Sequence, residues 1–373
     1  MTGPRVAIAH DYLTQLGGAE RVVLSMARAF PGAPIYTTLY EPELTFPEFR
    51  DLPVKPSPLN RIRTLRQRHR FALPLLPAAS SAVHIDADVV LASTSGWAHG
   101  FRTNGRLIAY CHSPARWLYL ADQYLGEQPG WVRPALRAMH PALLHWDQQA
   151  ARRPARYLAN STVVRDRIKT AYGRDATIVH PPHSIDASAP RAPIAELNGW
   201  GDPGIRHHLL VSRLLPYKNV PEAIAAFRDL PGQRLLVVGR GPLEARLRAD
   251  LPGNVRILSG ISDAQLRWAY AEAAAVIATS FEDFGLTPLE GNAFGVPTLA
   301  LRAGGYLDTV VDGVNGSFFE QPNAEGIRAA VVTNLEHRWD RDRVRRHADR
   351  FSEEAFAAAL REEVEQVWRA SGG

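Results

Sequence analysis

The sequence predicts an α/β protein made of two doubly wound, Rossmann-like domains that face a cleft. Short apolar strands and amphipathic helices alternate in two series, and a segment rich in Pro, Ala and Gly separates the series after His180. Such alternation produces parallel sheets covered by helices. The 373 residues also exceed the length that one hydrophobic core usually spans. We therefore expect an N-terminal domain at 1–183, a C-terminal domain at 184–350 and a last segment at 351–373.

In the first series, apolar runs with polar ends are typical of buried parallel strands. We expect these strands at 6–9, 35–39, 88–92, 107–110, 157–159 and 177–179, and helices at 22–30, 131–153 and 162–172. Gly17 and Gly18 then lie in the first strand-to-helix loop, where glycines let a backbone approach a ligand, although a lone glycine pair is more typical of a tight turn. His112 follows the strand at 107–110, at the sheet edge where ligands collect.

The second series predicts a second sheet of the same kind. We expect strands at 208–211, 234–238, 255–258, 273–278 and 298–301, and helices at 220–227, 243–251, 263–273 and 353–368. Arg213 and Lys218 lie in the loop after the first of these strands, and Gly239 follows the second. Gly260 and Ile261 follow the third strand, where backbone contacts to a base are expected. Loops of this kind gather at one edge of a parallel sheet.

The stretch from Ser280 to Glu290 joins a buried strand to a helix. A helix N-terminus favours an anion, because its first N–H groups and its dipole point outward. The N–H groups concerned are those near Phe284, Gly285, Leu286 and Thr287. Glu282 and Glu290 bracket this turn and can hold hydroxyl groups on either side of the anion. An anion between two hydroxyl-bearing groups describes a nucleotide sugar.

Composition restricts the class of protein further. The apolar fraction of 46% and the charged fraction of 22% are ordinary for a globular protein. The single cysteine, Cys111, excludes an internal disulfide and fits a reducing compartment, so we expect a cytoplasmic protein without signal peptide or membrane span. We also expect no metal, because Asp86-Ala-Asp88 lies at the wrong end of its strand and no His/Cys cluster is present. The net charge of +5 suggests an acidic partner: nucleotide phosphate, anionic lipid or nucleic acid.

Residues 54–73 carry a run of cations with no acid among them. Apolar residues recur within this run at roughly helical spacing. A basic amphipathic helix of this type lies on an anionic membrane surface, and a solvated face over a packed helix is the alternative. Binding of nucleic acid is not expected, since the run lacks interleaved aromatic residues.

Several motifs in order resemble the retaining glycosyltransferases of family 4, which have the GT-B fold. The resemblance rests on Glu282-x7-Glu290 with its internal Phe-Gly-Leu-Thr-Pro, on Arg213-Leu-Leu-Pro-Tyr-Lys218 and on Gly17-Gly18-Ala-Glu. It also includes the motifs Gly239-Arg-Gly-Pro242, Tyr110-Cys-His112-Ser-Pro114 and Ala159-Asn-Ser161. It extends over essentially the whole chain.

The resemblance implies roles for these residues. Arg213 and Lys218 would neutralise the leaving diphosphate, Glu282 would contact hydroxyls of the donor sugar and Glu290 those of the ribose. Gly17 and Gly18 would close over the diphosphate, and His112 would lie near the C6 hydroxyl and reacting face of the sugar. The reaction would retain the anomeric configuration without a metal or another cofactor, and the last helix would pack back on the N-terminal domain.

The partners expected are a nucleotide sugar and a glycan or lipid-linked acceptor. The motifs are most similar to mannosyltransferase-like members, which favours GDP-mannose as the donor; UDP-glucose and UDP-N-acetylglucosamine are alternatives. A soluble small-molecule acceptor is the alternative to an acceptor at a membrane surface. An epimerase, a glycan phosphorylase and a non-catalytic sugar-nucleotide sensor are rival functions, and the Arg213, Lys218 and Glu282 set argues against a sensor.

Overall fold

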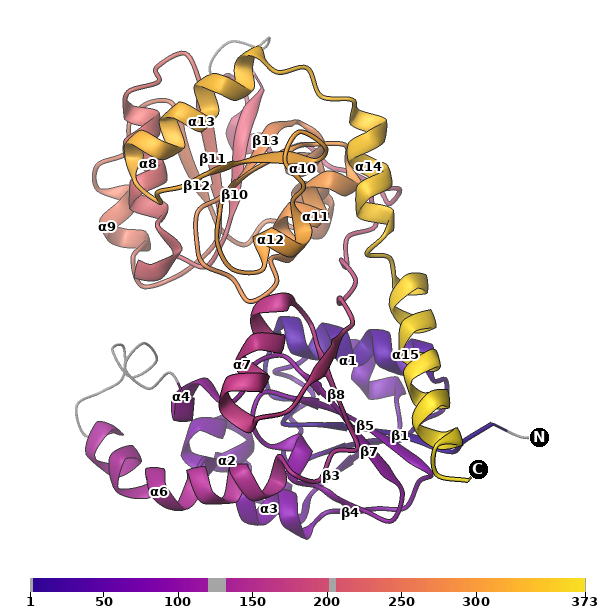
Figure 1. The fold of residues 1–373 in the computed structure, drawn as a ribbon. Helices are drawn as coiled ribbons and strands as arrows, with labels where there is room; N and C mark the ends of the chain where they lie inside the picture. The colour runs from indigo at the N-terminus through magenta and orange to yellow at the C-terminus, as the bar shows by residue number, and fades with distance from the viewer. Residues whose placement is uncertain (1–2, 120–131, 201–205, 373) are drawn as a thin grey trace. The chain divides into compact units, whose positions relative to one another are not determined.

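The computed structural model describes residues 3–119, 132–200 and 206–372 (Figure 1). The chain forms two compact units. The first unit comprises Met1–Pro182 together with Glu353–Gly373, and the second comprises His183–Ser352. The boundaries thus lie one and two residues from those expected at 183/184 and 350/351.

The first unit is built on a parallel sheet of seven strands in the order β3-β2-β1-β5-β7-β8-β9. These are β1 Val6–His10, β2 Ile35–Thr37, β3 Val54–Pro56, β5 Val89–Thr94, β7 Arg106–Cys111, β8 Arg156–Ala159 and β9 Ala176–Ile178. A separate pair joins β4 His84–Ile85 to β6 Arg102–Thr103. Ile8 of β1 packs into one buried cluster, while Ala7 and Ala9 pack into another. Both faces of the sheet are therefore covered, as the apolar runs indicate.

The helices of this unit include one that comes from the far end of the chain. They are α1 Gly18–Ala29, α2 Arg63–Gln67, α3 Leu76–Ala82, α4 Arg116–Tyr119, α6 Val132–Ala150, α7 Thr162–Tyr172 and α15 Glu353–Arg369. The last of them, α15, lies beside α1 (Figure 1) and buries Phe356 and Leu360 in the same cluster as Ile8. Glu363 of α15 also accepts a hydrogen bond from Arg156 Nη1 at 2.6 Å.

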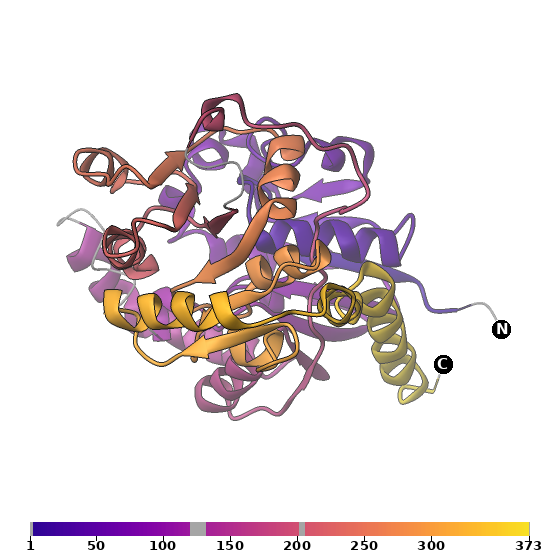
Figure 2. The same cartoon turned by 90° about the horizontal axis from the view of Figure 1, so that it is seen from above.

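The second unit repeats the plan with a parallel sheet of six strands in the order β12-β11-β10-β13-β14-β15. The strands are β10 His207–Val211, β11 Arg234–Val238, β12 Val255–Leu258, β13 Ala273–Ala278, β14 Thr298–Leu301 and β15 Gly316–Phe319. The helices are α8 Val220–Arg228, α9 Glu244–Arg248, α10 Asp263–Ala271, α11 Leu286–Ala293, α12 Tyr306–Thr309, α13 Ala324–Glu336 and α14 Arg341–Asp349. Helices lie on both sides of this sheet (Figures 1 and 2), and Leu235 and Leu236 of β11 point into different clusters.

The basic segment at 54–73 is not a single amphipathic helix, so that expectation was wrong. It consists of β3, a 3₁₀ turn at Pro58–Arg61, the five-residue α2 and a second 3₁₀ turn at His69–Ala72. Pro56 and Pro58 lack the N–H that a continuous helix would need. Ser57, between these prolines, accepts a hydrogen bond from Leu59 N at 3.2 Å and so caps the first turn.

Two neighbouring histidines, His207 and His208, are buried in β10. His207 Nε2 contacts the carbonyl oxygen of Ala269 at 2.9 Å, and the ring of His208 packs edge-on against Phe227 at 5.3 Å. Burial lowers the pKa of each to about 4, from an ordinary value of 6.5. Both rings are therefore neutral in the folded protein at physiological pH.

We predict that acid destabilises the protein through these two histidines. Between about pH 6.5 and pH 4 the unfolded chain binds more protons than the folded one, so stability present above this window is lost as the pH falls. Each histidine contributes at most about 1.4 kcal/mol per pH unit to the free energy of unfolding. Urea unfolding of a His207→Gln/His208→Leu variant should show a shallower pH dependence than wild type over this window, and identical slopes would contradict the prediction.

Candidate functional site

The candidate residues of the second unit lie after neighbouring strands at the carboxyl edge of its sheet. Arg213 and Lys218 follow β10, Gly239 follows β11 and Gly260 follows β12. The connections from β10 run to one side of it, through β11 to β12, while β13 pairs with its other side. Loops diverge at such a switch point and leave room for a ligand. Glu282 follows β13 and faces the loop of Lys218 across this point.

Lys218 and Glu282 form an ion pair at the switch point. Lys218 Nζ contacts Glu282 Oε1, and the same oxygen accepts a hydrogen bond from Ser280 Oγ at 2.5 Å. Lys218 is only 8% exposed. Thr279 Oγ1 donates to the carbonyl oxygen of Lys218 at 2.6 Å, and Asn219 Nδ2 donates to that of Thr279 at 2.9 Å. The loop carrying the lysine is thus attached to the end of β13.

Arg213 lies in the same loop but has a different partner. Its guanidinium is exposed and donates through Nη2 to the hydroxyl of Tyr217 at 3.0 Å. Lys218 Nζ lies over the ring of Tyr217, 4.9 Å from the centroid. Tyr217 therefore links the two cations through its hydroxyl and its ring, a role that the sequence analysis missed.

The turn at 280–285 rests on the loop that precedes α12. Gly305 N donates to the carbonyl oxygen of Glu282 at 2.8 Å. A side chain on Gly285, whose φ is +89°, would meet the ring of Tyr306 at 2.5 Å. Because Gly285 caps α11 without a side-chain hydrogen bond, the first N–H groups of the helix, at Leu286 and Thr287, have no side-chain cap.

Glu290 lies one turn into α11, and its orientation is set by a buried tyrosine. Tyr270 donates its hydroxyl to Glu290 Oε2 at 2.6 Å. The ring of Tyr270 stacks on Phe294 with the planes 3° apart. Burial, followed by the charge of Glu290, raises the pKa of Tyr270 well above its ordinary value, so the hydroxyl remains a donor. The remaining part of the carboxylate is partly exposed.

Gly239, Gly260 and Ile261 lie farther along the same edge. A side chain on Gly239 would meet the carbonyl oxygen of Ser212 at 1.8 Å, so this glycine allows two loops of the protein to pack closely. Gly260 has a φ of +73°, which favours glycine. Ile261 is partly buried against an apolar cluster.

In the first unit, Gly17 precedes α1 and His112 follows β7. A side chain on Gly17 would meet Glu20 Oε2 at 2.3 Å, whereas no atom lies within 4 Å of the corresponding position on Gly18. His112 Nε2 lies 2.8 Å from Ser93 Oγ. Burial, with the charges of His10 and Arg116, lowers the pKa of His112 to about 3. His112 is therefore a neutral ring.

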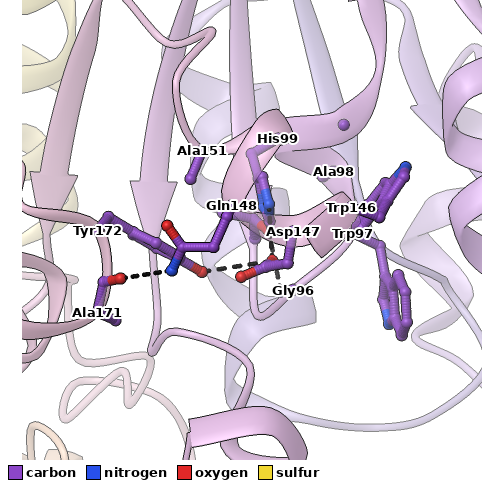
Figure 3. Close-up of polar contacts among 12 residues, drawn as sticks. Gly96, Trp97, Ala98, His99, Trp146, Asp147, Gln148, Ala151, Ala171 and Tyr172 are labelled. Carbon is purple, nitrogen blue, oxygen red and sulfur yellow. Dashed lines mark hydrogen bonds and ion pairs between the residues drawn. The ribbon is translucent and has the colours of Figure 1, made fainter. Parts of the chain in front are cut away.

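The first unit also contains a second group of buried polar side chains, which the sequence analysis did not identify. His99 Nδ1 lies 3.0 Å from Thr94 Oγ1, and His99 Nε2 lies 3.0 Å from Asp147 Oδ1 (Figure 3). Asp11 accepts hydrogen bonds from the backbone N–H groups of Trp97 at 3.0 Å and Ala98 at 2.6 Å. These contacts fix the loop after β5. The signal in the sequence was the polar residues Thr94, Ser95 and His99 at and just after the end of that strand.

The structure thus brings Arg213, Lys218, Glu282 and Glu290 to one edge of the second unit, together with the N-terminus of α11. Gly17 and His112 lie at the corresponding edge of the first unit. Within the described ranges, no group of three His, Cys, Asp or Glu side chains could hold a metal ion. No helix in that part of the chain is long and apolar enough to cross a membrane.

Two doubly wound units, each with polar residues at its switch point, define a protein of the GT-B fold. Two family models match consecutive parts of the chain: Glycosyltransferase Family 4 at residues 16–188 and Glycosyl transferases group 1 at residues 206–355. The chain belongs to the family 4 glycosyltransferases. The fold class expected from the sequence is confirmed.

Curated relatives support the same family. A GDP-mannose-dependent alpha-(1-6)-phosphatidylinositol monomannoside mannosyltransferase of Mycolicibacterium smegmatis is 32% identical over 194 residues, which is 46% of this chain and 50% of that protein. A glycogen synthase of Thermus thermophilus is 43% identical over 107 residues, which is 27% of this chain and 24% of that protein. The chain therefore aligns with half or less of the length of these relatives.

Solved structures share the fold over almost the entire chain. The HepE protein of Anabaena in complex with UDP superimposes with a TM-score of 0.70 at 18% identity, covering 97% of this chain and 100% of that chain. Sucrose-phosphate synthase of Thermosynechococcus elongatus gives a TM-score of 0.67 at 16% identity, covering 98% of this chain and 100% of that chain. At such identities the likeness concerns the fold.

We predict that Gly239→Ala destabilises the protein by about 1–3 kcal/mol, because the new methyl group would overlap the backbone of Ser212. Gly232→Ala is the matched control, since no atom lies within 4 Å of its added Cβ; the control should change stability by less than about 1 kcal/mol. Thermal unfolding of both variants measures the difference. Equal stability of the two variants would contradict the close packing of these loops.

Proposed function

We propose that the protein transfers a sugar from a nucleoside diphosphate sugar to a hydroxyl group of an acceptor, with retention of the anomeric configuration. The observation that carries the proposal is the Lys218–Glu282 pair at the switch point of the second sheet, beside the N-terminus of α11. Cation, carboxylate and helix N-terminus together match a ligand that joins a diphosphate to a hydroxylated ring.

The cationic residues and the carboxylate would have different roles in the reaction. Cleavage of the bond to the diphosphate develops negative charge on the phosphate and positive charge on the sugar ring. Arg213 and Lys218 would stabilise the departing phosphate oxygens, together with the N–H groups near Phe284, Gly285, Leu286 and Thr287. Lys218 would move part of its contact from Glu282 to the phosphate. Glu282 would then accept hydrogen bonds from the sugar hydroxyls.

The remaining residues would hold the two ends of the donor. Glu290, oriented by Tyr270, would accept hydrogen bonds from the ribose, and the backbone at Gly260 and Ile261 would contact the base. In the first unit, Gly17 and Gly18 would approach the diphosphate, and His112 would donate to a sugar hydroxyl. No metal takes part in this scheme, because the cations and N–H groups supply the positive charge.

GDP-mannose is the donor that we favour. The mannosyltransferase relative, which is GDP-mannose-dependent by name, supports this choice. A UDP-sugar is the alternative, supported by the HepE structure with UDP. Release of nucleoside diphosphate from a panel of GDP- and UDP-sugars, with and without acceptor, distinguishes these donors from each other and from non-catalytic binding.

We predict that Lys218→Ala lowers turnover of the preferred sugar nucleotide by about 100-fold or more, since preorganised charge stabilisation of this kind contributes about 3–4 kcal/mol. Lys169→Ala is the control: this lysine is exposed and pairs with Asp175 in the first unit. Thermal unfolding verifies that both variants are folded. Near-normal turnover of the folded Lys218→Ala variant would remove the diphosphate role of this residue.

We also propose a glycan or lipid-linked acceptor at an anionic membrane surface, to which the protein binds peripherally from the cytoplasm. The surface concerned combines exposed cations, Arg61, Arg63 and Arg68, with exposed apolar side chains. Ile62 and Phe71 are each 49% exposed. Cations beside apolar side chains favour the interface of an anionic bilayer.

We predict that replacing Arg61, Arg63 and Arg68 together with Gln weakens binding to anionic vesicles by about 1 kcal/mol per arginine. Replacement of Arg228, Arg248 and Arg328 removes the same charge from the second unit, from side chains that are 43–48% exposed. Vesicle sedimentation with increasing phosphatidylserine measures the difference. If both triple variants bind as wild type does, a soluble acceptor is favoured.

A further inference from the structure

Four polar side chains of the first unit, three from α1, β1 and β5 and one from the loop after β7, form a chain of contacts that ends at His112. Glu20 Oε1 of α1 lies 3.8 Å from Nε2 of His10, at the end of β1. His10 Nδ1 lies 3.1 Å from the carbonyl oxygen and 3.0 Å from Oγ of Ser93, in β5. Ser93 Oγ lies 2.8 Å from His112 Nε2. His10 and Ser93 are direct partners in the parallel pairing of β1 with β5.

The carbonyl oxygen of Ser93 fixes the direction of the hydrogen bond from His10. A carbonyl oxygen only accepts, so the proton lies on His10 Nδ1. The Ser93 hydroxyl also faces this N–H and therefore accepts from it. Its own proton is then available for His112 Nε2, the direction in which this hydroxyl both accepts and donates. A neutral His112 that accepts at Nε2 carries its proton on Nδ1.

The charges along the chain agree with this direction. Burial opposes protonation of His10, but the nearby carboxylate of Glu20, followed by that of Asp11, outweighs burial and raises the pKa of His10. Burial and then the charge of His10 lower the pKa of His112 to about 3. His10 and Glu20 are 2% and 1% exposed, so this charge pair lies inside the unit. These contacts thus join a buried histidine–carboxylate pair to a neutral imidazole.

We propose that Ser93 and His10 are positioning residues that hold His112 as a neutral ring with its proton on Nδ1. This inference rests on the proposed function, in which His112 faces the donor sugar. A neutral N–H can donate to a sugar hydroxyl without adding positive charge beside a ring that becomes positive in the transition state. A protonated His112 would add positive charge beside the sugar ring. A His112 with its proton on Nε2 would direct its N–H to Ser93 and not to the sugar.

The same series of side-chain contacts extends to the glycine loop before α1. Glu20 Oε1 accepts a hydrogen bond from Gln15 Nε2 at 2.9 Å, and Glu20 Oε2 occupies the space that a side chain on Gly17 would need. Glu20 thereby holds the loop and pairs with His10. The glycine loop and His112 are positioned through one set of contacts.

The tautomer of His112 can be measured directly. Two-bond ¹H–¹⁵N correlation spectra of ¹⁵N-histidine-labelled protein distinguish a protonated Nδ1 from a protonated Nε2, and His112 is identified by the absence of its signals in His112→Ala. We expect protonated Nδ1 in wild type and a mixture of tautomers in Ser93→Ala. Ser80→Ala is the control, since Ser80 is buried in the same unit and its hydroxyl has no hydrogen-bond partner among the described residues. Protonated Nε2 in wild type would overturn the proposal.

Kinetics test whether Ser93 acts through His112. We expect Ser93→Ala to lower kcat roughly tenfold, the effect of about 1.4 kcal/mol in the barrier, and to add no further loss in a His112→Ala background. His10→Asn retains an N–H donor near the position of Nδ1 and should keep more activity than His10→Gln. Independent, additive effects of Ser93→Ala and His112→Ala would overturn the proposal. If the protein transfers no sugar at all, the proposed function fails, while the spectra still decide the tautomer.

Discussion

The candidate site of each unit depends on one parallel pairing. In each sheet the first strand along the chain pairs on one side with the next strand and on its other side with a later strand, and the second of these pairings is the one concerned. In the first unit this is β1 with β5, and in the second it is β10 with β13. Connections leave the first strand toward one side and come back on the other, so the loops after the paired strands diverge. Each opening contains a polar contact: His10 with Ser93 between the two strands, and Lys218 with Glu282 between the loops that follow them. The candidate site follows from topology before any ligand is considered.

Each opening also contains a charge pair that is largely removed from water. Lys218 and Glu282 are 10% and 28% exposed in their side chains, and His10 and Glu20 are 3% and 1% exposed. A buried charge is tolerated when hydrogen bonds and an opposite charge compensate it. In the second unit Ser280 supplies such a bond to Glu282. These pairs therefore fix the loops in position.

The sequence was sufficient for most strands of the two sheets and for the edge at which the candidate residues lie, because apolar runs ending in polar residues identify buried parallel strands. The edge strands β3 and β15 were not predicted. It was insufficient for residue partners, since contacts such as Tyr270 with Glu290 depend on how separate elements pack. The strand expected at 88–92 stops before Ser93, although β5 extends through Thr94 and pairs Ser93 with His10. At 54–73 the helical spacing of apolar residues was misleading, because the segment is a strand followed by three short helical turns; Pro56 and Pro58 exclude a helix only at its start.

The glycines of the motifs show how a signature can combine structure with binding. Gly239, Gly285 and Gly17 each lie where an added side chain would meet the protein itself, at a backbone oxygen, a tyrosine ring and a carboxylate. Glycine is therefore required at these three positions first of all because the loops pack closely within each unit. Gly18 differs, because the space beside it is open and it begins α1, where backbone N–H groups have no intrahelical partner. In the proposed function, the backbone at Gly18 would therefore contact the phosphate, and Gly17 would allow Glu20 to hold that backbone in place.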